Sequence, residues 1–248
     1  MVPLFDAYAG FGGTKPGVQA PVRPSEWSGE MERLSIGRAL VRVAPDDLDT
    51  DFASSNETLL KACEDFQPFV PCPVVVPAAA CDTIPEDEQV AAALARGAGA
   101  ACLRPKRDCW ILSEWACGEL FEALVARRMP VLCREGQVPL QQVAELAGRY
   151  PELPIILAEV GYRSLRVLLP LLETFGNVHL SLGGGFSLHQ GIEQLVDKAG
   201  AERLLFGTGF PESEPMAAVA QLMYAAISDQ QRAMIGSGNL ERLLGGIR

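Results

Sequence analysis

Eight short apolar runs, each followed by a stretch with helical spacing, limit the fold of this chain more than any other feature. The runs comprise residues 4–7, 39–43, 69–76, 100–103, 131–133, 155–158, 178–182 and 204–208. Each run is continuously hydrophobic and does not alternate with polar residues, which is typical of a parallel strand buried on both faces. Parallel strands that alternate with helices form either a closed (β/α)8 barrel or an open doubly wound sheet, so we expect one of these two folds.

The stretches between the runs carry the spacing and the end signals of helices. Residues 117–124 place apolar side chains three and four positions apart, which gathers them on one face of a helix. Pro85, followed by three acidic residues, suits a first helical turn, and residues 228–231 form a capping box. Pro170 falls inside another helical stretch, so we predict a kink or a new helix start there.

Length and charge narrow the class of protein. The chain has 248 residues, and one (β/α)8 barrel needs about 250, so we expect a single domain over residues 1–248. No apolar run approaches the roughly 20 residues that cross a membrane, and the first six residues lack the features of a secretory signal. The formal net charge of −10 repels nucleic acid and anionic lipid. We therefore expect a cytoplasmic protein that binds neither nucleic acid nor membrane.

Three stretches of the sequence carry a family resemblance. Residues 4–12 read LFDAYAGFG, residues 203–211 read RLLFGTGFP and residues 238–244 read GNLERLL. In this order they resemble the amidohydrolase-related (β/α)8 barrels, and the resemblance extends from Asp6 to Leu244. It favours a single-domain TIM-type barrel of eight parallel strands with outer helices, and it implies a functional site at the C-terminal ends of the strands.

The resemblance also implies a divalent metal, but other residues stand at the ligand positions here. The family's first strand runs into Asp-x-His-x-His, its sixth strand ends in a histidine and its eighth in Gly-Thr/Ser-Asp-x-Pro. The matching positions in this chain hold Tyr8 and Gly10, Glu159, and Gly209, while Arg134 takes the place of a histidine after the fifth strand. Glycine offers no side-chain ligand and arginine is a poor one, so we expect no bound transition metal and no cofactor.

Charged residues at the expected barrel mouth predict a site for a small anionic molecule. Loss of a divalent cation leaves carboxylates that need a counter-charge, and Arg134 can supply it to Glu159 and Asp6. We expect Arg134 and Glu159 to pair across neighbouring strands, either as an ion pair that only stabilises the barrel or as part of a site. Tyr8 would form a polar aromatic wall, and Arg104 follows the fourth strand as a second candidate for binding an anion.

Two functional classes remain open. In the first, a binding protein holds a carboxylate or phosphate group with Arg134 and Arg104. In the second, a metal-independent hydrolase or lyase uses Glu159 as general acid or base and Arg134 to stabilise a developing anion. A further alternative is an Mg²⁺ or Ca²⁺ ion held by Asp6, Glu135 and Glu159, which the nearby arginine disfavours by charge repulsion. The sequence leaves open whether the barrel is catalytic.

The helix expected after the last strand predicts self-association. A barrel helix buries one broad stripe against its own strands, whereas apolar residues occupy much of the perimeter of this helix. These residues are Met216, Val219, Leu222, Met223 and Tyr224. We predict a symmetric homodimer, and the alternative is that residues 230–235 and 239–244 of the same chain cover this surface.

Overall fold

The computed structural model describes residues 2–13, 21–44, 51–183 and 186–248. Within these ranges it contains eight strands, and each overlaps one of the apolar runs, so the predicted order of strands is confirmed. They are β1 (Phe5–Phe11), β2 (Arg38–Val43), β3 (Phe69–Pro71), β4 (Ala101–Leu103), β5 (Val131–Arg134), β6 (Ile155–Ala158), β7 (Val178–Leu182) and β8 (Leu204–Phe206).

The strands pair in parallel and in chain order, as β1–β3 in one sheet and β4–β8 in the other. Two isolated bridges join these sheets. One links Val74 to Cys102, between β3 and β4, and the other links Ala9 of β1 to Phe210, just after β8. Parallel pairing therefore continues around the whole ring, and the fold is a TIM-type barrel and not an open sheet.

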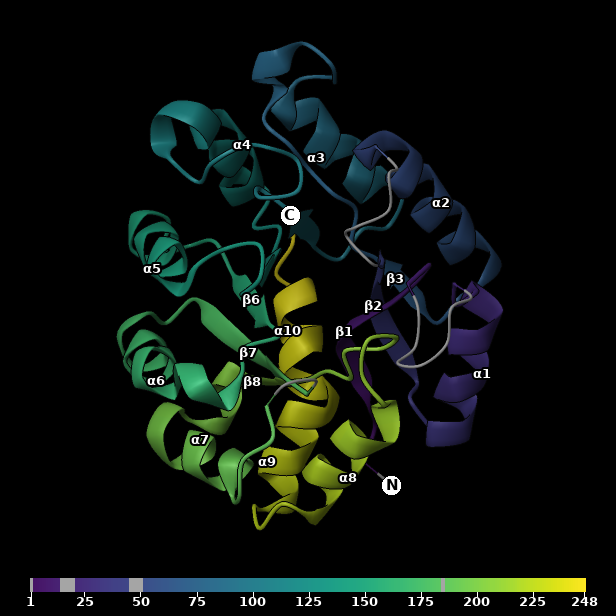
Figure 1. Ribbon diagram of the computed structural model, residues 1–248, viewed down its shortest axis with the longest axis vertical. Coiled ribbons are helices and arrows are strands. Elements are labelled where there is room, and N and C mark those ends of the chain that lie inside the picture. Colours follow the sequence, from purple (N-terminus) through teal and green to yellow (C-terminus); the bar gives the residue numbers. More distant parts are fainter. Residues whose placement is uncertain (1, 14–20, 45–50, 184–185) are drawn as a thin grey trace.

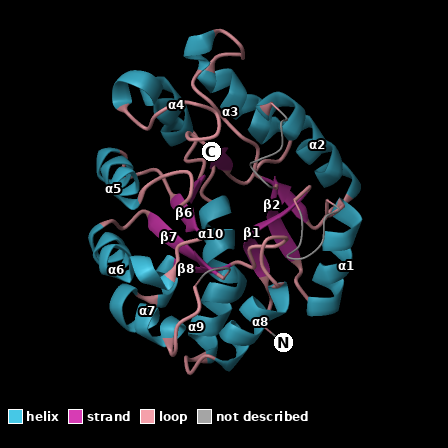
Figure 2. Cartoon of the chain, in the orientation of Figure 1, coloured by secondary structure: helices cyan, strands magenta, loops and turns pink. Residues whose placement is uncertain are grey.

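Helices form the outer layer around the strands (Figures 1 and 2). In chain order they are α1 (Pro24–Leu34), α2 (Phe52–Asp65), α3 (Glu86–Ala95), α4 (Glu114–Ala126), α5 (Leu140–Arg149), α6 (Leu165–Thr174), α7 (Gly191–Ala199) and α8 (Pro215–Tyr224), followed by α9 (Asp229–Ala233) and α10 (Asn239–Leu244). None of the helices in the described ranges is both long and apolar enough to cross a membrane.

The helix ends largely match the sequence signals. Pro85 occupies the position before the first residue of α3, and acidic residues fill the first turn of this helix. Ser228 and Gln231 form the predicted capping box of α9. The new helix start allowed at Pro170 is wrong, because α6 continues through this residue. Pro170 and Arg166 are both exposed, so the carbonyl left without its helical partner can bond to water. Buried leucines on the opposite face hold α6 against the barrel.

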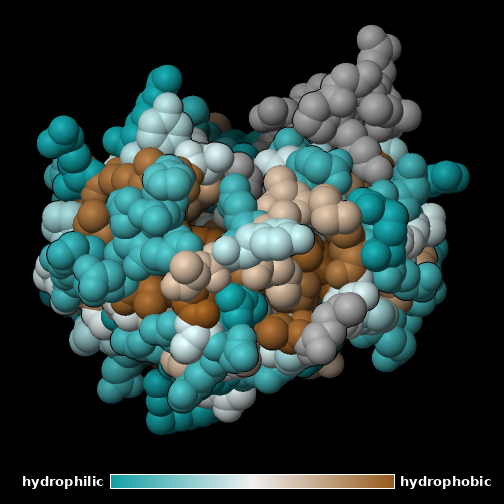
Figure 3. Space-filling model, turned by 90° about the horizontal axis from the view of Figure 1, so that it is seen from below, coloured by the Kyte–Doolittle hydropathy of each residue, from teal (hydrophilic) through white to brown (hydrophobic). Residues whose placement is uncertain are grey.

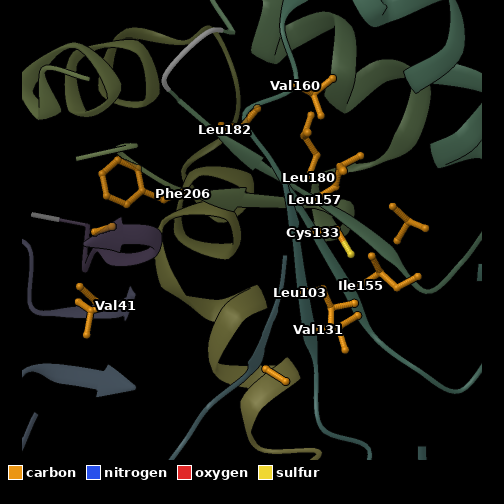
Figure 4. Close-up of a cluster of buried hydrophobic side chains, with 14 of the residues drawn as sticks. Val41, Leu103, Val131, Cys133, Ile155, Leu157, Val160, Leu180, Leu182 and Phe206 are labelled. Atoms are coloured by element: carbon orange, nitrogen blue, oxygen red, sulfur yellow. The ribbon is translucent and has the colours of Figure 1, made fainter. Parts of the chain in front are cut away.

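Strand side chains alternate between two apolar cores. On β6, Ile155 and Leu157 pack in the larger core between strands and helices, while Ile156 and Ala158 pack inside the ring. Figure 4 shows side chains of the larger core on several strands. The strand positions that point inward therefore decide which polar groups reach the interior and its C-terminal mouth.

The last helix, α10, closes the N-terminal end of the ring. Leu240 and Leu243 belong to the inner core. The side-chain amide of Asn239 donates hydrogen bonds of 2.8 Å to the carbonyl oxygens of Ala201 and Leu204, at the start of β8. In Figure 1, α10 lies across the centre of the ring of strands. The interior is thus covered at this end, whereas the charged side chains described next lie at the other end.

Candidate functional site

A network of charged and polar side chains joins the C-terminal ends of four strands. The Glu159 carboxylate, just after β6, accepts a 2.8 Å hydrogen bond from Nε of Arg134 and a 2.7 Å hydrogen bond from the Tyr8 hydroxyl. Arg42 of β2 donates from Nη2 to the Tyr8 hydroxyl at 2.6 Å and to Oε1 of Glu212 at 2.8 Å. Residues distant in sequence therefore converge on one carboxylate at the barrel mouth.

The predicted pairing of Arg134 with Glu159 is confirmed by this geometry. Arg134 is the last residue of β5, and its register partner on β6 is Ala158, the residue before Glu159. The side chains remain 17% and 25% exposed, respectively, so both reach solvent at the mouth. The pair is thus only partly desolvated.

The backbone of Glu159 adopts the left-handed conformation, with φ of 58°. Ala158 already points into the ring, so regular strand geometry would turn the next side chain outward. The positive φ breaks this alternation at the residue whose carboxylate bonds to Arg134 and Tyr8. For a residue other than glycine such a conformation costs roughly 1–2 kcal/mol, and it persists where surrounding contacts fix it.

The charges around Glu159 keep it ionised. Burial raises the pKa of its carboxyl, but attraction to Arg134 and Arg42 and the hydrogen bond from Tyr8 outweigh burial, so the pKa lies below its ordinary value. Burial also raises the pKa of the Tyr8 hydroxyl, although Arg42 lowers it in part. At neutral pH the site therefore combines a carboxylate with a protonated phenol that donates to it.

Arg42 and Glu212 are parts of this network that the sequence reasoning missed. The side chain of Arg42 is only 2% exposed, and its Cζ lies 4.4 Å from the centre of the Tyr8 ring. One signal was available: an arginine inside the apolar run 39–43, two residues after the inward-facing Leu40, must point into the ring near its C-terminal end. No comparable signal marks Glu212, which lies in a loop after β8.

Asp6 is fully buried, and its carboxyl bonds to a residue of β1 and to a residue just after β8. Its carboxyl accepts hydrogen bonds from the backbone N–H groups of Tyr8 and Thr208, at 2.9 and 3.1 Å, and from the Thr208 hydroxyl at 2.5 Å. Burial raises its pKa to about 7, against the opposing effect of these bonds. Asp6 thus ties β1 to the segment after β8 and is held by Thr208, whereas Glu159 is held by Arg134.

Arg104 bonds to a carboxylate in its own loop, whereas Glu135 bonds to two residues in the segment after β6. Arg104 is 3% exposed and forms two hydrogen bonds with the Asp108 carboxylate, at 3.1 and 3.0 Å. Glu135 accepts hydrogen bonds from the Ser164 hydroxyl and from the backbone N–H of Gly161. Both residues lie after strand ends, as expected, but the structure gives each a partner outside the Arg134–Glu159 pair.

The described acidic residues at the mouth do not gather around one point where they could share a metal ion. Across the described ranges, no three side chains of His, Cys, Asp or Glu gather where they could hold an ion. Asp6, Glu135 and Glu159 bind separate partners, so the Mg²⁺ or Ca²⁺ alternative built on these three carboxylates is wrong. The carboxylate that does face the mouth, Glu159, lies beside the guanidinium groups of Arg134 and Arg42, which repel a cation.

The closed ring of parallel strands with outer helices defines the class of protein as a TIM-type barrel. Residues 18–246 match the model of the Amidohydro_2 family, described as amidohydrolase, and the chain belongs to that family. A comparison with curated protein sequences gave no match.

Solved structures with a similar fold include several decarboxylases. The 5-carboxyvanillate decarboxylase LigW from Sphingomonas paucimobilis has a TM-score of 0.75 at 15% identity, with 100% of both chains covered. Dihydroxybenzoic acid decarboxylase from Polaromonas sp. JS666, solved with bound manganese and the inhibitor 2-nitroresorcinol, has a TM-score of 0.72 at 16% identity, with 99% of this chain and 97% of that chain covered. A TIM-barrel protein from Bordetella bronchiseptica, Bb4693, has a TM-score of 0.74 at 15% identity, with 98% and 99% covered. At these identities the similarity establishes the fold.

Proposed function

We propose that this protein binds a small anionic molecule, a carboxylate or a phosphate, at the C-terminal mouth of the barrel, without metal-assisted hydrolysis. The observation that carries the proposal is the guanidinium group of Arg134, which is partly exposed at the mouth and already holds a carboxylate, that of Glu159. Guanidinium groups form paired hydrogen bonds with carboxylate and phosphate oxygens, so Arg134 suits an anionic ligand.

In this proposal the rest of the network orients the binding groups. Glu159 accepts a hydrogen bond from a hydroxyl of the ligand, and Tyr8 provides an aromatic wall beside it. The buried Arg42 bonds to the Tyr8 hydroxyl and lies 4.0 Å from Glu159, so it fixes both side chains. The oppositely charged groups hold one another before any ligand arrives, which lowers the entropy lost on binding.

Asp6, Arg104 and Glu135 complete the mouth in this proposal by holding its loops, since each bonds to a neighbouring protein group. The ligand class agrees with the names of the similar structures, which describe decarboxylases of 5-carboxyvanillate and of dihydroxybenzoates. Those names belong to those proteins. For this chain they support a carboxylate that also carries a hydroxyl group as the first ligand to test.

A second candidate function is a metal-independent hydrolase or lyase. The left-handed backbone of Glu159 favours it, because such conformations gather at active sites. With its lowered pKa, Glu159 is a carboxylate at neutral pH and would act first as a general base, while Arg134 stabilises the anion that develops. Against this candidate, each oxygen of the carboxylate already accepts a hydrogen bond, from Arg134 or from Tyr8, and its pKa is lowered and not raised.

Calorimetric titration of EDTA-treated protein with 2,6-dihydroxybenzoate and, separately, with inorganic phosphate tests the proposal. Elemental analysis of the same sample checks that it carries no zinc, iron or manganese. We expect saturable binding of at least one probe, weakened about tenfold or more in Arg134→Ala, because one charge-assisted contact is worth roughly 1.4 kcal/mol or more.

Arg166→Ala is the matched control, since Arg166 is exposed on α6 and its loss changes the net charge equally. Binding that appears only after manganese is added, or that weakens equally in both variants, would refute the proposal. Turnover of 2,6-dihydroxybenzoate by the metal-free protein, abolished in Glu159→Gln, would instead establish the second candidate.

A further inference from the structure

A cavity of about 810 Å³ lies at the end of the barrel opposite the mouth. Its lining includes Pro154, Asn177 and Arg203, which directly precede β6, β7 and β8, respectively. It also includes His179, the second residue of β7. Because the strands are parallel, their first residues all lie at the N-terminal end of the ring. This cavity is therefore separate from the Arg134–Glu159 pair.

Positive charge dominates the lining of this N-terminal cavity. Four arginines and two glutamates line it: Arg128, Arg203, Arg242 and Arg248, with Glu152 and Glu202. The excess of two positive side chains stands out in a chain whose formal net charge is −10. A concave surface of one sign concentrates ions of the opposite sign.

The arginine charges of the cavity are only partly compensated inside the protein, since Glu202 attracts Arg203 without forming an ion pair with it. Arg203 donates to the carbonyl oxygens of Val178 and Phe175, and Arg242 donates to the carbonyl oxygen of Glu202. Carbonyl groups satisfy N–H donors but carry no net charge. Among residues 2–13, 21–44, 51–183 and 186–248, none of the four lining arginines has a carboxylate within ion-pair distance, whereas Arg42, Arg104 and Arg134 each have one.

Two buried nitrogen atoms on the cavity wall lack a hydrogen-bond partner within the described part of the chain. They are Nδ1 of His179, a side chain 4% exposed, and Nε of Arg128. A buried polar atom without a partner is costly, and in native proteins it commonly marks a place for water, an ion or a ligand. Burial, followed by the charges of Arg203 and Arg242, lowers the pKa of His179 to about 3. An anion beside these arginines would remove part of that repulsion.

We propose that the N-terminal cavity is a second binding site, which takes a small phosphate-bearing molecule between Arg128, Arg203 and Arg242. A phosphate group carries close to two negative charges at neutral pH, matching the excess of two positive side chains, and its oxygens accept several hydrogen bonds at once. Phe175 and Leu243 add apolar surface to the same wall, suited to the organic part of a phosphate ester. The site does not depend on the function proposed for the mouth.

The two histidines of the chain give a direct test by NMR. His179 lines the cavity, whereas His189 is exposed and does not. We expect titration of the full chain with inorganic phosphate, at constant ionic strength, to move the imidazole signals of His179 saturably and leave those of His189 unchanged. The His189→Gln protein assigns the signals. The pKa of His179 should rise when phosphate is bound, since the anion offsets its two arginine neighbours.

Variants separate this site from general charge effects and from the mouth. Arg242→Gln should weaken phosphate binding about tenfold, and its exposed position on α10 makes it tolerant of substitution. Arg127→Gln removes the same charge from an exposed residue that does not line the cavity, and Arg134→Ala alters the mouth; both should leave the His179 response intact. No saturable shift of His179, or an equal loss in Arg127→Gln, would overturn the proposal. A response lost only in Arg134→Ala would assign phosphate to the mouth instead.

Discussion

Arg42 contacts Tyr8 in two ways, since its Nη2 donates a 2.6 Å hydrogen bond to the phenol oxygen and its Cζ lies 4.4 Å from the ring centre. The same guanidinium reaches Glu212 at 2.8 Å and Glu159 at 4.0 Å. One buried cation thus holds two acids and an aromatic ring from three different parts of the chain. The Arg42 guanidinium therefore fixes the positions of these three side chains at the barrel mouth.

We predict that Arg42→Met destabilises the protein by about 3–5 kcal/mol, the usual result of removing one partner of a buried charge pair. Glu212 and Glu159 would then lose the counter-charge of Arg42, whose own side chain is only 2% exposed. Urea unfolding followed by circular dichroism measures the change. Arg38→Met is the matched control on the same strand, because Arg38 is exposed and stacks on Phe5, and it should cost below about 1 kcal/mol. Equal effects of the two variants would contradict the prediction.

The pair of Arg134 and Glu159 predicts non-additive stability changes. The side chains are 17% and 25% exposed, so solvent screens the pair in part, and we expect a coupling energy of about 1–2 kcal/mol. Thermal melts of Arg134→Ala, Glu159→Ala and the double variant give this energy. Glu159→Ala should lower the stability more than Arg134→Ala does, because it also removes the hydrogen-bond acceptor of the Tyr8 hydroxyl. Strict additivity would show that the two residues do not interact.

Asp6 predicts a loss of stability as the pH rises from about 4 to 7. Burial raises the pKa of its carboxyl from 3.8 to about 7, so across this interval the folded state binds a proton that the unfolded chain has released. The contribution of Asp6 to the free energy of unfolding is full below the pKa that its carboxyl has in the unfolded chain. It disappears as the pH rises through the pKa of the carboxyl in the folded protein. A shift of this size corresponds to at most roughly 4 kcal/mol.

Urea unfolding at several pH values across that interval tests the role of Asp6. Asp6→Asn keeps an oxygen for the two backbone N–H groups and does not titrate, so its stability should be nearly constant there, apart from the shared background. Asp82→Asn, at an exposed carboxyl, should behave as the unchanged protein does. An identical pH dependence in Asp6→Asn and the unchanged protein would show that Asp6 is ionised in the fold.

The sequence predicted the barrel because its strands are buried on both faces and therefore read as apolar runs. It overestimated the length of β3, predicted to reach residue 76, because the pairing with β2 stops at Pro71 and Pro73 follows; proline has no N–H to donate. Beyond Pro73, the side-chain amide of Asn56 bonds to the backbone in place of a strand. It accepts a hydrogen bond from the N–H of Val74 and donates one to the carbonyl of Val74, both at 2.8 Å. A side chain on α2 that substitutes for a neighbouring strand leaves no periodic signal.

For the site, strand order made the Arg134–Glu159 pair predictable, because β5 and β6 are neighbours in any barrel of this order. The sequence also allows a prediction of the partner of Arg104, since Asp108 is only four residues away. The residues that carry the family resemblance include none on β2, so they do not point to Arg42. Its partner Glu212 could not be assigned from sequence, since the meeting of β2 with the loop after β8 depends on closure of the ring.

We predict that the protein forms a homodimer through α8. Tyr224 is 89% and Met216 44% exposed at opposite ends of this helix, whereas Leu222 is 1% exposed and packs within its own chain. The alternative of intramolecular cover therefore accounts for only part of the apolar surface. In Figure 3, hydrophobic patches lie among hydrophilic side chains on the face that carries the lower helices of Figure 1. Large exposed apolar side chains of this kind favour burial against a second copy.

Light scattering at micromolar concentration should give twice the mass of one chain. Tyr224→Glu combined with Met216→Glu should return the protein to one chain, because each charge would have to be buried in the interface. Trp115→Glu is the control, since Trp115 is 81% exposed on α4, on another part of the barrel surface, and should leave the dimer intact. The mass of a single chain for the unchanged protein would rule out the dimer, and a dimer that persists in the double variant would rule out α8 as its contact.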